Sequence, residues 1–192
     1  MKTLLSEEQR DALQELMNIS MGQAADALAR LISTRIMLSI PRIISATPAE
    51  FVAMFGAEQT YWFTRQSFLG NANGEVLTLL SKEGCEILAE AMDYELPLSE
   101  TSRCELILEL ANILAGACLS GFTNQLSLNT KLNMPTLYQP NFSDVSQYNW
   151  DSTLLLEVDF LVAKAHFESK VVICLDDRSV HALLEKLQQF LE

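Results

Sequence analysis

Apolar residues recur at helical spacing along two long stretches of the chain. Between residues 7 and 33 they follow the i, i+3, i+4 pattern of an amphipathic helix, and Ser6 before two glutamates predicts its N-cap. From about Ser102 to Leu128 a second helix is predicted, which is apolar on nearly every side. Shorter helices are predicted over residues 84–94 and 177–191.

Segments rich in β-branched, leucine and aromatic residues lie between these helices and predict strands. The expected strands are Arg35–Ile43 (ending near Pro41), Tyr61–Phe68, Val76–Leu80, a strand that leads to Pro135, Leu154–Phe160 and Val171–Leu175. The run from Asn71 to Gly74 predicts a hairpin turn. Residues 136–152 are predicted to form the one longer loop.

The two halves of the chain match when the first is shifted by 94 positions, which is the separation of Glu15 from Glu109. The match needs no gap across the first helix and the strand after it. The identical pairs are Glu15/Glu109, Leu16/Leu110, Asn18/Asn112, Ile19/Ile113, Gly22/Gly116, Ser33/Ser127, Leu38/Leu132 and Pro41/Pro135. Each half, 7–94 and 101–192, is therefore expected to be a unit of helix, three strands and helix.

One such unit would expose too much apolar surface to be stable alone. Two units can join their strands into one sheet that helices cover. We therefore predict an α/β protein of the α+β type: a single pseudo-twofold domain over residues 1–192. Its sheet is expected to be antiparallel, with the long helices on one side.

Charge and composition exclude several classes of function. The net charge of −12 argues against a nucleic-acid partner and against an anionic membrane surface. The N-terminus does not have the pattern of a signal peptide, and no uninterrupted apolar stretch is long enough to span a membrane. We expect a soluble cytoplasmic protein with four reduced, mostly buried cysteines, and no metal site, because neither histidine has ligand partners at metal-binding spacing.

A row of polar residues lies opposite the apolar face of the first helix, formed by Asp11, Glu15, Asn18 and Gly22. The second helix carries the same row, with Glu105, Glu109, Asn112 and Gly116. Asparagine is unfavourable inside a helix, so its repetition at one register favours a functional site. The alternative is an ordinary solvated face.

Gly22 and Gly116 are each one turn beyond their asparagine. A glycine inside a helix costs about 1 kcal/mol relative to alanine. Two explanations stay open: the missing side chain allows a partner to approach the helix, or it allows tight packing within the fold.

These residues resemble the signature of the CheC-type chemotaxis phosphatases (CheC, CheX and FliY). That signature has Asp or Ser, three residues, Glu, two residues, Asn, and twenty-two residues before Pro. Asp11, Glu15, Asn18 and Pro41 match it, and the second half repeats it up to Pro135. Glu105 departs from the pattern, because the family has Asp or Ser there.

The resemblance implies hydrolysis of the phosphoryl-aspartate of a CheY-like response regulator. It implies that Glu15 and Glu109 dock against the regulator, and that Asn18 and Asn112 reach into its active site to position water. Asp11 and Glu105 are assigned an auxiliary role beside each glutamate. No cofactor is then expected on this chain, because the regulator supplies Mg²⁺.

Other functions remain open. The chain could be a non-catalytic adaptor that binds a response regulator or a CheD-like deamidase. It could also be a flagellar-switch component, although neither the extra regulator-binding peptide nor the C-terminal domain of FliY-like proteins is expected in it. Both a monomer and a homodimer are compatible with the sequence.

Overall fold

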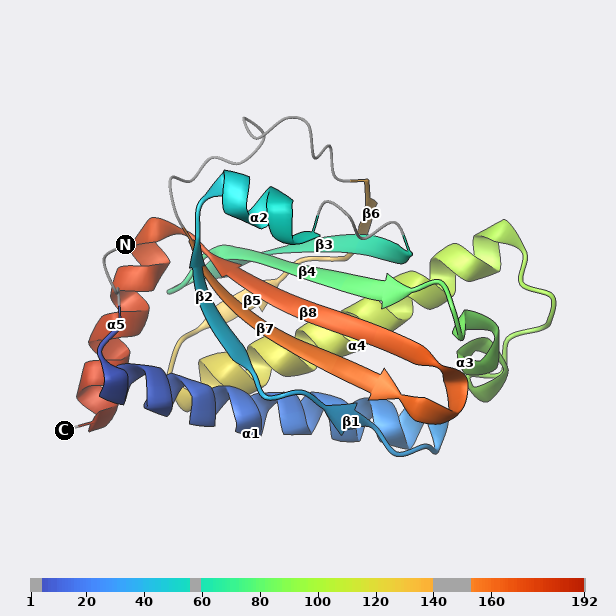
Figure 1. Cartoon of the computed structure of the whole chain (residues 1–192), viewed down its shortest axis with the longest axis horizontal. Coiled ribbons are helices and arrows are strands. Elements are labelled where there is room, and N and C mark those ends of the chain that lie inside the picture. The colour runs from blue at the N-terminus through green and yellow to red at the C-terminus, as the bar shows by residue number, and fades with distance from the viewer. Residues whose placement is uncertain (1–4, 56–59, 140–152, 192) are drawn as a thin grey trace.

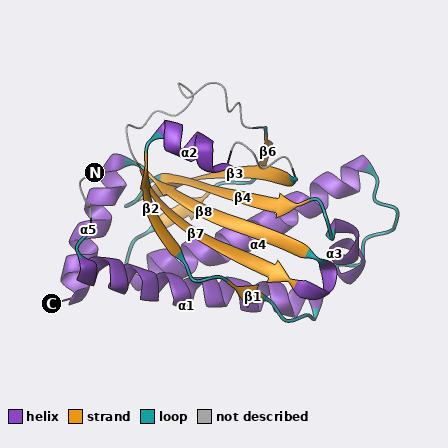
Figure 2. Ribbon diagram, viewed as in Figure 1, coloured by secondary structure: helices purple, strands orange, loops and turns teal. Residues whose placement is uncertain are grey.

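A computed structural model describes residues 5–55, 60–139 and 153–191. One antiparallel sheet of eight strands is covered on one face by the long helices α1 and α4, while the short helix α2 lies against the other face (Figures 1 and 2). The elements are α1 (Glu7–Ile32), β1 (Met37–Leu38), β2 (Arg42–Ala46), α2 (Pro48–Phe55), β3 (Tyr61–Gly70), β4 (Gly74–Ser81), α3 (Cys85–Ala91), α4 (Glu100–Gln125), β5 (Thr130–Leu132), β6 (Thr136–Tyr138), β7 (Thr153–Val162), a 3₁₀ turn (Ala163–Ala165), β8 (Phe167–Leu175) and α5 (Asp177–Leu191).

The sheet order is β1-β7-β8-β4-β3-β5, with β2 also paired to β7 and β6 also paired to β3. All of these pairings are antiparallel. The central β4–β8 pair joins the two halves of the chain into one continuous sheet. The predicted fold class is therefore confirmed.

Hydrogen bonds between residues close in sequence set the start of α1 and the ends of both long helices. At the start of α1, Ser6 Oγ accepts from the Gln9 backbone N–H and the Gln9 side chain accepts from the Ser6 N–H, which completes a capping box. At the ends of the helices, Ser33 and Ser127 both adopt positive φ angles, of 50° and 53°. The N–H after each of these serines bonds to the carbonyl five residues earlier, so the same turn follows each long helix.

The main core lies between the sheet and the two long helices, and it explains why α4 is so apolar. Leu110, Leu114 and Cys118 are fully buried in it, packed with Met17 and Met21 of α1. By length and composition α4 is the one described helix that could cross a membrane, but 61% of its apolar window is buried inside the fold. Its hydrophobicity is therefore accounted for by the core.

Three local predictions are wrong. The segment 35–43 is not one strand: Ser39–Pro41 separate β1 from β2, because proline lacks the N–H that a continuous ladder needs. Residues 136–138 form β6, and the rest of the predicted loop, 140–152, lies outside the described residues. Helix α2 was not expected, although Thr47 and Glu50 cap it reciprocally and Pro48 occupies its first turn.

The cysteines are free thiols. Cys85, Cys118 and Cys174 are buried and Cys104 is half-buried, in line with the expected reduced state. Burial raises the pKa of Cys85 to about 11 and also raises the pKa values of Cys118 and Cys174. These three thiols are therefore inert at neutral pH.

Candidate functional site

The first Glu/Asn pair lies on the solvent face of α1. Asp11, Glu15 and Asn18 are all exposed, while Leu13 and Met17 on the opposite side are fully buried. Since residues three or four apart on a helix are neighbours, Glu15 and Asn18 form one small polar patch. Within the described part of the chain neither side chain has a hydrogen-bond partner.

The second pair has the same placement on α4. Glu105, Glu109 and Asn112 are exposed, although almost every residue between them is buried or half-buried. A helix this apolar exposes few polar side chains, so the exposed ones mark the part of α4 that reaches the surface. The predicted row is thus present on both helices.

The second pair is held by other residues, in contrast to the first. The Tyr94 hydroxyl donates to Glu109 Oε2 at 2.9 Å, and Gln66 Nε2 donates to Asn112 Oδ1 at 3.2 Å. Burial, followed by the hydrogen bond to Glu109, raises the pKa of Tyr94 to about 12, so its hydroxyl stays a donor at physiological pH. Sequence patterns gave no signal for Tyr94 or Gln66, because both contacts join separate elements.

The two motif prolines belong to turns that lie against these helices. Pro41 is buried, and its carbonyl accepts a 3.2 Å hydrogen bond from Gln14 Nε2, next to Glu15 on α1. Pro135 is half-buried, and two residues before it the Asn133 carbonyl accepts a 3.1 Å bond from Gln66 Nε2. Each proline turn therefore flanks its own Glu/Asn pair.

Gly22 and Gly116 do not mark the place where the helices touch. A Cβ atom at either position would meet no heavy atom within 4 Å. The close approach is at Gly121, where a Cβ would come within 2.9 Å of Ser20 Cα and of Gln23 Oε1. Of the two explanations for Gly22 and Gly116, the structure favours open space above the helix.

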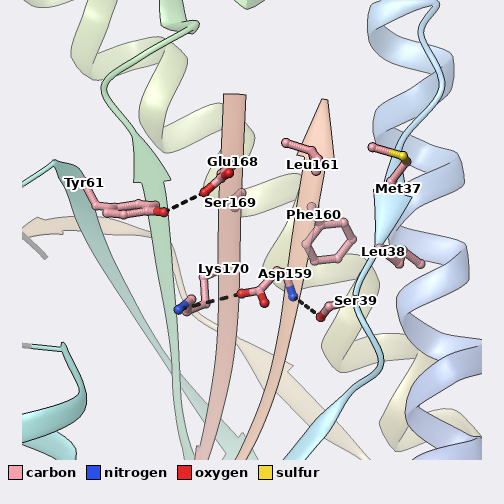
Figure 3. Close-up of a pocket in the computed structure, with 10 residues that line it drawn as sticks. All are labelled: Met37, Leu38, Ser39, Tyr61, Asp159, Phe160, Leu161, Glu168, Ser169 and Lys170. Carbon is pink, nitrogen blue, oxygen red and sulfur yellow. Dashed lines mark hydrogen bonds and ion pairs between the residues drawn. The ribbon is translucent and has the colours of Figure 1, made fainter. Parts of the chain in front are cut away.

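Two cavities lie away from both pairs. One of about 330 Å³ is on the sheet face that carries α2, and Figure 3 shows two pairs among its charged and polar groups: Tyr61 with Glu168 at 3.0 Å and Lys170 with Asp159 at 3.8 Å. The other, of about 460 Å³, lies between Trp62 and Arg103. Neither cavity includes a residue of the predicted rows.

Each site therefore offers one carboxylate and one amide on a convex helix surface. A carboxylate can accept hydrogen bonds from a cationic side chain, and an amide can both donate and accept. Among the described residues no group of three or more His, Cys, Asp and Glu side chains is placed to hold a metal. Such a surface suits docking to a partner that brings its own reactive groups.

Known proteins resemble this chain in one segment of sequence and in fold. Residues 8–45 match the model of the CheC-like family. FliY from Thermotoga maritima superposes with a TM-score of 0.71 at 16% identity, covering 96% of this chain and 98% of FliY. The structure is also similar to CheX from Desulfovibrio desulfuricans (TM-score 0.59, 12% identity, 84% and 99% covered) and to the FliM middle domain from H. pylori (0.67, 12%, 95% and 99%).

The resemblance to the CheC/CheX/FliY family is confirmed. The CheC-like segment runs from α1 to β2 and contains Asp11, Glu15, Asn18, Gly22 and Pro41. The second pair, on α4, lies outside that segment and rests on the internal match between the halves. The FliY and FliM likenesses extend over nearly the whole chain, so this chain has the fold of both proteins.

Proposed function

We propose that the protein is a cytoplasmic phosphatase that hydrolyses the phosphoryl-aspartate of a CheY-like response regulator. One observation carries the proposal: an exposed Glu/Asn pair at the same register on both long helices, the first of them inside the CheC-like segment. Glu15, Asn18, Glu109 and Asn112 are the proposed active residues.

The reaction requires little chemistry from this chain. Water attacks phosphorus, the bond from phosphorus to the aspartyl oxygen breaks, and the aspartate leaves as a carboxylate. Mg²⁺ and a lysine of the regulator would neutralise the phosphoryl oxygens, so that positioning the water is the remaining task. Alignment of the reacting groups can lower the activation free energy by several kcal/mol.

The two side chains divide this work. Glu15 or Glu109 would accept a hydrogen bond from the regulator's lysine and so fix the docking geometry. Asn18 or Asn112, one helical turn away, would contact the water or the phosphoryl group through its amide. Asp11 and Glu105 would lie at the edge of the docking surface, and Gly22 and Gly116 would leave room for the regulator's backbone.

A second function, non-catalytic binding, is favoured by the likeness to the FliM middle domain, since FliM from H. pylori also resembles this chain in a complex with FliG. In that case the same helix faces would bind a response regulator, or a CheD-like deamidase, and signal by association. The two functions predict different effects of removing the asparagine amides.

The deciding experiment follows the decay of a phosphorylated CheY-like regulator with catalytic amounts of this protein. Wild type should accelerate decay with turnover, and the quadruple variant Glu15→Ala/Asn18→Ala/Glu109→Ala/Asn112→Ala should not. Each double variant would show the share of one site. If wild type binds the phosphorylated regulator and leaves its decay rate unchanged, the phosphatase proposal is wrong and the adaptor function replaces it.

A further inference from the structure

We infer that Gln66 of β3 is a positioning residue for the second site, where it fixes the side-chain amide of Asn112 in one orientation. The geometry comes from hydrogen bonds between β3, α4 and the turn after β5. The catalytic consequence rests on the proposed phosphatase function.

The orientation of both amides follows from a single main-chain group. Gln66 Nε2 lies 3.1 Å from the Asn133 carbonyl oxygen, which can only accept, so the nitrogen of Gln66 must face it. The same nitrogen lies 3.2 Å from Asn112, whose facing atom must then be the acceptor Oδ1. Asn112 Nδ2 is left as the donor available to a docked regulator.

Among the described residues the first site has no such partner, and the strand registers show why. Leu132 of β5 pairs with Phe68 and Thr136 of β6 with Arg65. In the first half, Leu38 pairs with Phe160 and Arg42 with Glu157. Phe160 therefore corresponds to Phe68, and Val158 occupies the position of Gln66.

Stability does not explain a glutamine at this position. Gln66 is 1% exposed, and its Oε1 is buried with no hydrogen-bond partner among the described residues. A half-satisfied buried amide is less favourable than an apolar side chain, and the other half carries an apolar residue, Val158, at this position. A residue that is unfavourable for folding and bonded to the proposed catalytic amide is best explained by that amide's function.

The consequence is that Asn112 is already ordered before the water reacts, whereas Asn18 must be ordered in the transition state. Immobilising one flexible side chain costs enough to change a rate or affinity by about 2- to 10-fold. In the second site, the amide would present Nδ2 to the phosphoryl group or the water as a donor, because Oδ1 faces Gln66. The first site can use either end of the Asn18 amide.

The test measures the activity of the second site alone, in a Glu15→Ala/Asn18→Ala background. The rate of decay of the phosphorylated regulator is followed over a range of regulator concentrations. Gln66→Met, which is similar in length, should lower kcat by about 2- to 10-fold with KM unchanged, and should not lower the melting temperature. Gln66→Val, which copies the first half, should lower kcat by the same factor, although its smaller side chain leaves a cavity and lowers the melting temperature. Thr64→Val is the matched control: Thr64 is also buried on β3, but its hydroxyl bonds to the Thr78 carbonyl, so kcat should not change.

An unchanged kcat in both Gln66 variants would overturn the inference, as would a kcat that falls only together with the melting temperature. A readout without turnover keeps it testable if the protein is not a phosphatase. In ¹⁵N relaxation of the free protein, the Asn112 side-chain amide should be more rigid than that of Asn18. Gln66→Val should remove this difference, and equal mobility in wild type would refute the positioning role.

Discussion

The Tyr94 hydroxyl donates a 2.9 Å hydrogen bond to Glu109 Oε2 and so links the segment after α3 to the second Glu/Asn pair. The bond occupies one carboxylate oxygen and leaves Oε1 for a partner. Together with the bond from Gln66 to Asn112, it makes the second site a pre-ordered surface. The first site, on α1, has no equivalent bond among the described residues.

Removing this hydroxyl should weaken docking at the second site. In the Glu15→Ala/Asn18→Ala background, Tyr94→Phe is expected to raise KM for the phosphorylated regulator by about 2- to 10-fold, because Glu109 must then be ordered on binding. kcat should change little, since Asn112 keeps its own partner. A fall in KM would mean instead that Tyr94 competes with the regulator for Glu109.

Tyr94 should also titrate unusually late. Burial first, and then the Glu109 carboxylate, raise its pKa from 10.0 to about 12. The folded state favours the neutral phenol, so the stability from this group is fully present below pH 10 and is lost as the pH rises towards 12. Difference absorbance of phenolate should show a late phase that Tyr94→Phe removes and that Glu109→Gln moves to lower pH.

Substitutions on the sheet face that carries α2 should change the stability of the protein and leave its phosphatase activity unchanged. Glu157 is 1% exposed, and its Oε1 contacts Arg42 at 2.5 Å and Lys170 at 3.3 Å. Arg42→Met should lower the free energy of unfolding in urea by about 1–3 kcal/mol, less than for a fully buried pair because the Arg42 side chain is 57% exposed. The triple variant Arg42→Met/Glu157→Leu/Lys170→Met should be more stable than Arg42→Met, because it removes every charge of this buried cluster.

Sequence periodicity predicted the parts of this protein that depend on local interactions. The capping box at Ser6 and the spacing of core residues set the length of α1, and the repeated Glu/Asn register was visible before any strand was placed. Helix α2 was missed although its Thr47–Glu50 capping box is local, because the segment between two strands is short. The break at Pro41 was also missed, because β1 and β2 are separated by three residues and read as one strand in the sequence.

The supporting contacts of the second site were not predictable in this way. Gln66 is separated from Asn112 by 46 residues and from Asn133 by 67; the packing of α4 against β3 brings Asn112 to it, and the pairing of β3 with β5 and β6 brings Asn133. In the sequence, Gln66 is one polar residue in an aromatic-rich strand. The difference between the two sites therefore appears only when strand registers are known.

The helix glycines provide a further test of packing. Gly121→Ala should destabilise the protein by about 1–3 kcal/mol in urea unfolding, because the new Cβ would overlap Ser20 across the contact between α1 and α4. Gly22→Ala and Gly116→Ala are the matched controls and should raise stability by up to about 1 kcal/mol, since they gain helix propensity without meeting any atom. A stabilising Gly121→Ala would show that the helices do not approach so closely.

Larger substitutions at the same two glycines separate stability from function. The double variant Gly22→Leu/Gly116→Leu should stay folded, because the space above each glycine is open. It should nevertheless raise KM for the phosphorylated regulator by about tenfold or more, as the added side chains would stand in the docking surface beside Asn18 and Asn112. Fluorescence titration with the regulator would measure the same loss as a weaker Kd. Unchanged affinity in a well-folded double variant would place the regulator elsewhere on the molecule, and the glycines would then have no part in docking.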